Sequence, residues 1–326
     1  MPRANSDRLM CGAMATPAAF CTTPGLMVFS VHSPAAEVRA GGKSLNVARV
    51  LHQQGHQTLA ISVAGGLTGE EFTRELSASG VPHRIIAVRA ATRRTIALVD
   101  EMHAATSIFN EFGENHSPAE WQRLTNATTA ALEQARCFVG SGSLPLGADP
   151  DFYPELVRAA TALRIPSVID TSGAALLAAA EAGATVLKPN RHELVEATGD
   201  ADPVRAARSL LDRGAALVLV SLGEEGMIAL SRDDPKHPLR ATLGRVLDGN
   251  PTGAGDAAVA AIAASLAGGI DDPEQILRLA TVWSAAAVLM PLAGEISPLH
   301  AQLADEVTIA PADPTTPADP TDRITR

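Results

Sequence analysis

Aromatic residues are scarce in this chain, and their scarcity argues against one class of partner. Only 3% of the 326 residues are aromatic, whereas 46% are hydrophobic. Proteins that bind single-stranded nucleic acid stack the bases on aromatic rings. The sequence also has no block of basic residues, and its formal net charge is −10. We therefore expect no nucleic-acid partner, and a core in which small side chains let helices pack closely on a sheet.

Cysteine is also rare, and long apolar runs are missing. The cysteines, Cys11, Cys21 and Cys137, are odd in number and have no metal-ligand spacing. A small, odd number of cysteines is typical of proteins in a reducing compartment, so we expect a cytoplasmic protein. No run reaches the roughly 18 apolar residues of a membrane span. We therefore expect no membrane partner.

Short apolar segments alternate with helical patterns along most of the chain. Strands are predicted at 137–140, 167–170, 185–188 and 216–221, and helices between them at 151–163, 174–182 and 202–213. This alternation predicts an α/β fold with a doubly wound, mostly parallel sheet and helices on both faces. Ligands of such folds bind beyond the carboxyl ends of the strands. Residues that directly follow strands are therefore the first candidates for function.

The strongest chemical signal is N-P-T-G-A-G-D-A at 250–257, at the entrance to a predicted helix over 254–267. Gly253 and Gly255 lack side chains, so backbone N–H groups can approach a phosphate, and the helix N-terminus favours negative charge. Asp256 stands where a carboxylate can accept the proton of an attacking hydroxyl, as phosphoryl transfer requires. An ordinary capped helix with Asp in its first turn is the alternative interpretation.

Two further segments follow predicted strands. In K-P-N-R-H-E at 188–193, Asn190 and Glu193 form a helix cap, or lie near Mg²⁺ and its waters with Lys188 near a phosphate. Both interpretations can hold at once. In S-L-G-E-E-G at 221–226, the alternatives are a hairpin turn and a surface against which a nucleotide lies.

A glycine-rich helix entrance, G-G-K-S-L-N-V-A-R, occurs earlier, at 41–49. It fails as a Walker A loop because the first glycine of that motif would fall on Glu37. The Gly-Gly-Lys entrance still suits an anionic or hydroxylated substrate, and a solvated lysine at a turn is the alternative. His52 and His56 are four residues apart but have no evident third ligand, so we expect no metal site there.

Seven segments occur in a characteristic order between about residues 41 and 300. They are G-G-K-S-L-N-V-A-R-V-L, A-G-G-L-T-G, S-G-S-L-P, D-T-S-G, K-P-N-R-H-E-L, V-S-L-G-E-E-G and N-P-T-G-A-G-D-A. Together they resemble the ribokinase-like (PfkB-type) carbohydrate kinases. Within that family they resemble most the branch with 1-phosphofructokinase and tagatose-6-phosphate kinase.

The resemblance implies a domain organisation. A kinase domain would cover 18–309, between a disordered N-terminus (1–17) and a disordered tail (310–326). A small β lid would come from about 28–40 and 94–112. Because the family often uses this lid for dimerisation, the resemblance also implies a homodimer through it.

The resemblance further implies a role for each matching residue. Asp256 would be the catalytic base, and Gly253, Ala254 and Gly255 would form the anion hole. ATP with Mg²⁺ would be bound by Lys188, Asn190, Glu193, Ser221, Gly223, Gly226 and Thr252, with Asn190 and Glu193 reaching the metal indirectly. A phosphorylated sugar would face Gly42, Lys43, Asn46, Arg93, Ser141 and Ser143, with Lys43 and Arg93 at its phosphate.

Two departures from the family pattern affect the expected substrate. The family's first strand ends N-P-A-L-D, whose Asp binds a substrate hydroxyl, but T-P-G-L-M at 23–27 puts Met27 at that place. Ser44 replaces the glycine of G-G-K-G. The sequence thus favours an ATP-dependent kinase of a phosphorylated sugar. A kinase of a cyclitol phosphate or modified sugar phosphate, and a non-catalytic nucleotide- or sugar-binding regulator, are the alternatives.

Overall fold

The computed structural model describes residues 10–12, 38–100, 105–145 and 147–312. Met27 and most of the first predicted lid segment, 28–37, lie outside the described residues. The described residues fall into two compact units. The smaller unit comprises those of Met1–Leu45, Thr58–Ala127 and Pro145–Ala148, and the larger unit those of Asn46–Gln57, Thr128–Leu144 and Asp149–Arg326.

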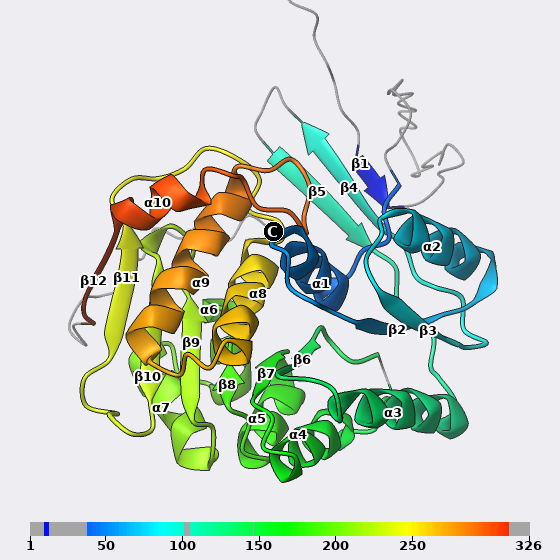
Figure 1. Cartoon of the computed structure of the whole chain (residues 1–326), viewed down its shortest axis with the longest axis horizontal. Helices are drawn as coiled ribbons and strands as arrows, with labels where there is room; N and C mark the ends of the chain where they lie inside the picture. The colour runs from blue at the N-terminus through cyan, green and yellow to red at the C-terminus, as the bar shows by residue number, and fades with distance from the viewer. Residues whose placement is uncertain (1–9, 13–37, 101–104, 146, 313–326) are drawn as a thin grey trace, which may run out of the picture. The chain divides into compact units, whose positions relative to one another are not determined.

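A seven-stranded sheet with the order β12-β11-β10-β9-β8-β7-β6 forms the centre of the larger unit (Figure 1). Strands β6 to β9 run parallel, and β9 to β12 run antiparallel. The strands are β6 (Phe138–Ser141), β7 (Ser167–Asp170), β8 (Val186–Leu187), β9 (Leu217–Ser221), β10 (Met227–Ser231), β11 (Leu239–Leu243) and β12 (Val307–Pro311). Burial of the parallel strands on both faces explains their continuous apolar sequences.

Helices connect the parallel strands, because a parallel pair needs a crossover. The helices of the larger unit are α4 (Phe152–Ala162), α5 (Gly173–Glu181), α6 (Arg191–Thr198), α7 (Pro203–Arg213), α8 (Ala254–Ala267), α9 (Pro273–Val288) and α10 (His300–Glu306), with residues 46–53 of α1 (Lys43–Gln53) and residues 128–132 of α3 (Pro118–Leu132). Helix α4 joins β6 to β7, α5 joins β7 to β8, and α6 with α7 joins β8 to β9. The predicted α/β class is confirmed.

Successive residues of β9 point to opposite faces of the sheet, each with its own core. Leu217 and Leu219 belong to a buried cluster with residues of α8 and α9. Val218 and Val220 belong to a second cluster with residues of α4, α5, α6 and α7. Helices therefore cover both faces of the sheet, as the sequence predicts.

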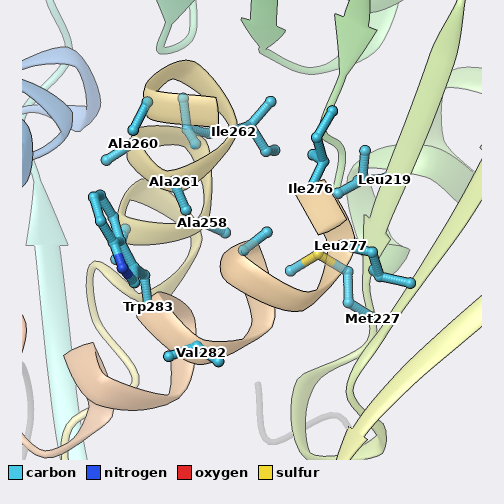
Figure 2. Close-up of a cluster of buried hydrophobic side chains, with 14 of the residues drawn as sticks. Leu219, Met227, Ala258, Ala260, Ala261, Ile262, Ile276, Leu277, Val282 and Trp283 are labelled. Carbon is cyan, nitrogen blue, oxygen red and sulfur yellow. The ribbon is translucent and has the colours of Figure 1, made fainter. Parts of the chain in front are cut away.

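Helix α8 is buried on nearly all sides, and it carries the G-A-G-D motif. Every residue from Asp256 to Ser265 is buried. Figure 2 shows this core, in which Ile276 and Trp283 of α9 belong to the same buried cluster as Ala260 and Ile262 of α8. A helix that is apolar on every side needs partners all round. The N-terminus of α8 is therefore supported by a densely packed core.

The smaller unit contains an antiparallel hairpin and a parallel pair of strands. β4 (Thr95–Asp100) and β5 (Ala105–Asn110) form the hairpin, within the segment 94–112 predicted for the lid, and β1 (Met10–Gly12) pairs with β4. β2 (Ala60–Ala64) runs parallel to β3 (His83–Ala87). The helices of this unit are α2 (Gly66–Ala78) and the first part of α3 (Pro118–Leu132).

Some elements lie where the sequence did not predict them. β1 falls inside the N-terminal segment predicted to be disordered, and β12 ends at Pro311, inside the predicted tail. The sequence also did not predict β3, β10, β11 and α10. Within the described ranges, every helix is too short or too polar to cross a lipid bilayer.

Candidate active site

The turn before α8 is held in shape by an asparagine and a glycine. Asn250 Oδ1 accepts a hydrogen bond from the Thr252 N–H at 3.0 Å, and Asn250 Nδ2 donates to the Pro291 carbonyl at 3.0 Å. Gly253, the N-cap of α8, has a φ of 88°, which favours glycine. A Cβ at Gly253 would lie 2.7 Å from the Cβ of Ala293. A larger residue would therefore strain the turn and displace the neighbouring loop.

The first turn of α8 presents backbone N–H groups beside a cation. The first N–H groups of a helix lack intrahelical acceptors and carry partial positive charge. A Cβ on Gly255 would lie 3.5 Å from Lys188 Nζ, so the ammonium lies next to this glycine. Backbone N–H groups and an ammonium are donors that bind phosphate oxygens. The anion hole predicted at 253–255 thus has a positive charge at its side.

Asp256 lies in the first turn of α8 and is only 7% exposed. Its Oδ2 accepts a hydrogen bond of 2.7 Å from Asn46 Nδ2, which comes from α1. The two residues are 210 positions apart in the chain. The sequence predicted that Asn46 faces the substrate, and nothing in it indicated a contact with the proposed base.

A buried ion pair lies at the carboxyl ends of the parallel strands. Asp170 ends β7, Ser141 ends β6, and Lys188 directly follows β8. Lys188 Nζ is 3.6 Å from Asp170 Oδ1, and Ser141 Oγ donates to Asp170 Oδ2 at 3.0 Å. The Lys188 and Asp170 side chains are only 3% and 2% exposed, so solvent screens their attraction little. The carboxylate thus holds the ammonium where it meets Gly255.

The loop after β6 is anchored close to this ion pair. Tyr153 Oη and Thr171 Oγ1 both donate to the Gly142 carbonyl, at 2.8 and 3.1 Å. Burial, and secondarily the charge of Asp170, raises the pKa of Tyr153, so its hydroxyl stays a donor. Ser143, which the sequence placed near the substrate, is exposed in this loop.

Asp170 is a candidate functional residue that sequence reasoning missed. D-T-S-G was one of the seven segments, but no role was predicted for its Asp. A signal was available, because β7 is buried at every position and a buried carboxylate needs a partner. That partner, Lys188, becomes apparent only when β7 and β8 pair in the sheet.

The residues predicted for the nucleotide lie on two adjacent segments. Asn190 Oδ1 accepts from the Glu193 N–H at 2.8 Å, and Glu193 Oε2 accepts from the Asn190 N–H at 2.9 Å. This capping box begins α6, as one of the two interpretations predicts. Asn190 also forms a parallel β-bridge with Ser221. The K-P-N-R-H-E and S-L-G-E-E-G segments therefore lie side by side.

The S-L-G-E-E-G segment forms the hairpin turn between β9 and β10. Gly223 and Gly226 bound its short 3₁₀ turn. Glu225 accepts a hydrogen bond from Arg191 and another, of 3.0 Å, from Arg240 Nη2. The first of these ion pairs ties the turn to the start of α6, and the second ties it to β11. The hairpin-turn interpretation is confirmed, and the nucleotide-binding role remains a prediction.

The oxygen atoms of Asn190 and Glu193 are better suited to contact the waters of a metal ion than to bind the ion directly. Among the described residues, no three His, Cys, Asp or Glu side chains gather closely enough to hold a metal ion. Asn190 Oδ1 and Glu193 Oε2 each accept a backbone N–H in the capping box. Amide and carboxylate oxygens are chemically suited to Mg²⁺, which usually keeps several of its waters. Indirect contact, as the sequence predicts, is the kind that these two side chains suit.

The predicted phosphate-binding residues lie in the smaller unit. Gly42 is exposed, Lys43 is half-buried at the start of α1, and Arg93 is exposed in the loop before β4. Arg93 lies close to Gly113, where a Cβ would be 3.8 Å from Arg93 Cδ. Gly42, Lys43 and Arg93 thus share the unit that contains the β4–β5 hairpin.

The larger unit brings a carboxylate, glycine-flanked N–H groups and an ammonium to one end of the parallel strands, which suits phosphoryl transfer. A profile of pfkB family carbohydrate kinases matches residues 22–299. The chain belongs to the pfkB family of carbohydrate kinases. The resemblance inferred from the seven segments is therefore confirmed. As a family member the protein is a kinase, and ATP is its expected cosubstrate.

Individual proteins similar in sequence and structure agree with this family membership. The kinase is 35% identical over 254 residues to the 1-phosphofructokinase of Xanthomonas campestris, covering 75% of this chain and 79% of the relative. It is 33% identical to the ATP-dependent 6-phosphofructokinase isozyme 2 of Mycobacterium tuberculosis, over 77% of this chain and 74% of that one. The tetrameric inhibited form of Escherichia coli phosphofructokinase-2 matches with a TM-score of 0.72 and 28% identity, over 91% of this chain and 94% of that chain.

Proposed function

We propose that this pfkB-family kinase transfers the γ-phosphoryl group of ATP to an alcohol of a phosphorylated sugar, as a 1-phosphofructokinase-like enzyme. The observation that carries the proposal is the convergence of Asp256, Gly255 and Lys188 at the start of α8. The names of the relatives from Xanthomonas campestris and Mycobacterium tuberculosis support a phosphorylated sugar as the acceptor.

In the proposed reaction, Asp256 accepts the proton of the attacking hydroxyl. A bond forms between the hydroxyl oxygen and the γ-phosphorus, and the bond from this phosphorus to the bridging oxygen of ADP breaks. The N–H groups of Gly253 and Gly255 and the Lys188 ammonium would stabilise the negative charge on the group in transfer. The Ala254 N–H donates to the Pro251 carbonyl at 3.1 Å. Mg²⁺ bound with ATP would neutralise further phosphate charge, and Asn190 and Glu193 would hold its waters.

The nucleotide is proposed to lie along the paired K-P-N-R-H-E and S-L-G-E-E-G segments. Their bridge between Asn190 and Ser221 puts the start of α6 beside the turn that contains Gly223 and Gly226. The hydrogen bonds of Asn250 hold Thr252 in the turn before α8. ATP is a cytoplasmic metabolite, which agrees with the compartment expected from cysteine usage.

A coupled assay of ADP release tests the proposed function. The acceptors are fructose 1-phosphate, fructose 6-phosphate, tagatose 6-phosphate, a set of cyclitol phosphates and the corresponding unphosphorylated compounds. We expect turnover of at least one phosphorylated acceptor, with kcat/KM about tenfold or more above its unphosphorylated counterpart. Saturable ATP binding without turnover of any acceptor would instead favour the non-catalytic regulator. Retention of Asp256 in the first turn of α8, directly after Gly253 and Gly255, argues against that alternative.

Lys43 and Arg93, two cations of the smaller unit, are expected to bind the phosphate that the substrate already carries. Charge-assisted hydrogen bonds contribute roughly 1.5–3 kcal/mol each. We therefore expect Lys43→Ala and Arg93→Ala each to raise KM for the sugar phosphate by about 10- to 100-fold, with KM for ATP nearly unchanged. Steady-state kinetics measures both constants, and Arg84→Ala, an exposed cation of the same unit, is the control. Unchanged sugar-phosphate KM in both variants would place the phosphate elsewhere.

Met27 motivates a second candidate, a kinase of a cyclitol phosphate or modified sugar phosphate. The family places an acceptor of substrate hydroxyl hydrogen bonds at this position, and Met is a poor acceptor. An unpaired buried hydroxyl costs about 1–3 kcal/mol, or one to two decades in kcat/KM. Met27→Asp is therefore expected to raise kcat/KM for the fructose phosphates about 10-fold or more relative to a deoxy or carbocyclic analogue. If the ratio of kcat/KM for the fructose phosphates to kcat/KM for the analogue is the same in Met27→Asp and in the unmodified chain, Met27 does not contact the substrate.

A homodimer through the lid is the quaternary structure that we propose. Phe109, in β5, and Phe112, just after it, are 58% and 93% exposed. Large exposed apolar side chains often belong to protein interfaces. The Escherichia coli relative forms a tetramer in its inhibited form. Sedimentation velocity of the full chain, over a tenfold concentration range, decides between a dimer and a monomer.

A further inference from the structure

In the contact between Asn46 and Asp256, the amide is the hydrogen-bond donor and the carboxylate is the acceptor. The donor–acceptor distance is 2.7 Å, which is short for a nitrogen donor and typical of a hydrogen bond to a charged group. An ionised carboxylate only accepts, so the amide of Asn46 must turn its nitrogen toward Asp256. Its carbonyl oxygen then points away from Asp256 Oδ2. The pairing therefore fixes the orientation of both side chains.

The helical segments that carry the two residues are both held in place. Residues Val47 and Val50 of α1, and all of α8 from Asp256 to Ser265, are buried. Close to Asn46, a Cβ on Gly294 would lie 3.2 Å from the Asn46 Cα, so the loop backbone supports the helix directly. Farther along α1, Gln53 donates to the Ile296 carbonyl at 3.0 Å and accepts from the Ile296 N–H at 2.9 Å. The Asn46 amide is thus presented from a fixed backbone.

We propose that Asn46 is a positioning residue for Asp256, an inference that rests on the proposed function. A carboxylate turns easily about its terminal torsion, which is broad and roughly two-fold. The hydrogen bond to Oδ2 restricts this rotation and so sets the direction of the whole carboxylate. A base must meet the hydroxyl proton at hydrogen-bond distance and in line with the reaction. Asn46 acts on kcat through the base, in addition to the substrate contact that the sequence predicts.

Two replacements of Asn46 separate positioning from substrate binding. Asn46→Asp keeps the shape of the side chain and can still accept a hydrogen bond from a substrate hydroxyl. It cannot donate to Asp256 without taking up a proton, and two adjacent carboxylates do not both ionise readily. We expect kcat to fall by about 10²-fold or more, and further than in Asn46→Ala, with KM for ATP within threefold of the unmodified chain. A kcat within threefold of the unmodified chain, with only the sugar-phosphate KM raised, would overturn the inference.

A swap of the two side chains tests the contact without using activity. In Asn46→Asp alone the two carboxyl groups must either repel or take up a proton, and both cost free energy at neutral pH, so the melting temperature should fall. In the double variant Asn46→Asp/Asp256→Asn an amide again faces a carboxylate, and the melting temperature should return toward that of the unmodified chain. A double variant at least as destabilised as Asn46→Asp would overturn the contact. This measurement stays informative if no acceptor is turned over, so failure of the proposed function is distinguishable from failure of this inference.

Gln53→Ala is the matched control on the same helix. It removes the other pair of side-chain hydrogen bonds that anchors α1 but leaves Asn46 and Asp256 in place. We expect a lower melting temperature with kcat within about threefold of the unmodified chain, because the base keeps its partner. A loss of kcat in Gln53→Ala as large as in Asn46→Asp would show that loosening α1, rather than the Asn46 amide, controls the rate, and would overturn the inference.

Discussion

Replacement of Asp256 by Asn is expected to lower kcat by about 10²–10⁴, the usual contribution of a general base. The amide cannot take the proton from the attacking hydroxyl at neutral pH, while the shape of the side chain is kept. Asn46 can still donate to the carbonyl oxygen of the introduced amide, so the fold of the site should persist. Rapid-mixing and steady-state kinetics with the best acceptor of the panel measure the effect.

The control for this variant is a carboxylate in the first turn of another helix. Glu274 lies in the first turn of α9 and is half exposed, so Glu274→Gln removes a similar charge without touching the site. We expect Glu274→Gln to keep kcat, and Asp256→Asn to keep its affinity for ATP in calorimetric titration. Turnover by Asp256→Asn within a few-fold of the unmodified chain would exclude Asp256 as the base.

Replacement of Lys188 by Met is expected to have the largest effect on stability. The side chains of Lys188 and Asp170 are almost fully buried. Removal of one partner from a buried ion pair leaves the other charge without compensation, which typically costs about 3–5 kcal/mol. Met has a similar length, so the change in packing is small. Urea denaturation of the variant and the unmodified chain measures the difference in the free energy of unfolding.

A double variant separates the structural role of the pair from its catalytic role. Asp170→Asn removes the carboxylate charge that loses its ion-pair partner in Lys188→Met, and the amide oxygen of Asn can still accept from Ser141 Oγ. We expect Lys188→Met/Asp170→Asn to recover most of the lost stability, because neutral replacement of a whole buried pair is often neutral or stabilising. Its turnover should stay low, because the cation beside Gly255 is missing. A double variant as unstable as Lys188→Met alone would show that the uncompensated charge of Asp170 is not the cause of the lost stability.

The sequence by itself determined the elements that depend on short-range patterns. Strand β7 and helix α8 begin and end at the predicted residues, 167–170 and 254–267. In β7 an apolar run ends at a polar residue, and in α8 a glycine-rich entrance leads into a continuous run of helix formers. The same local order of glycine and aspartate pointed to phosphoryl transfer before any contact was known. The seven segments then indicated the pfkB family, which the comparisons confirm.

Only the tertiary structure decided which distant residues meet. The Asn46–Asp256 hydrogen bond joins positions 210 apart, and the Lys188–Asp170 pair depends on β8 lying beside β7. The antiparallel strands likewise depend on pairing, β10 with β9, β11 with β10 and β12 with β11, because a five-residue strand has a weak signal of its own. Local propensity acts over a few residues, whereas partner choice is set by how the whole sheet and its helices bury their apolar faces. The residue types proposed for the site were therefore readable from the sequence, and the contacts that Asp256 and Lys188 make with distant residues were not.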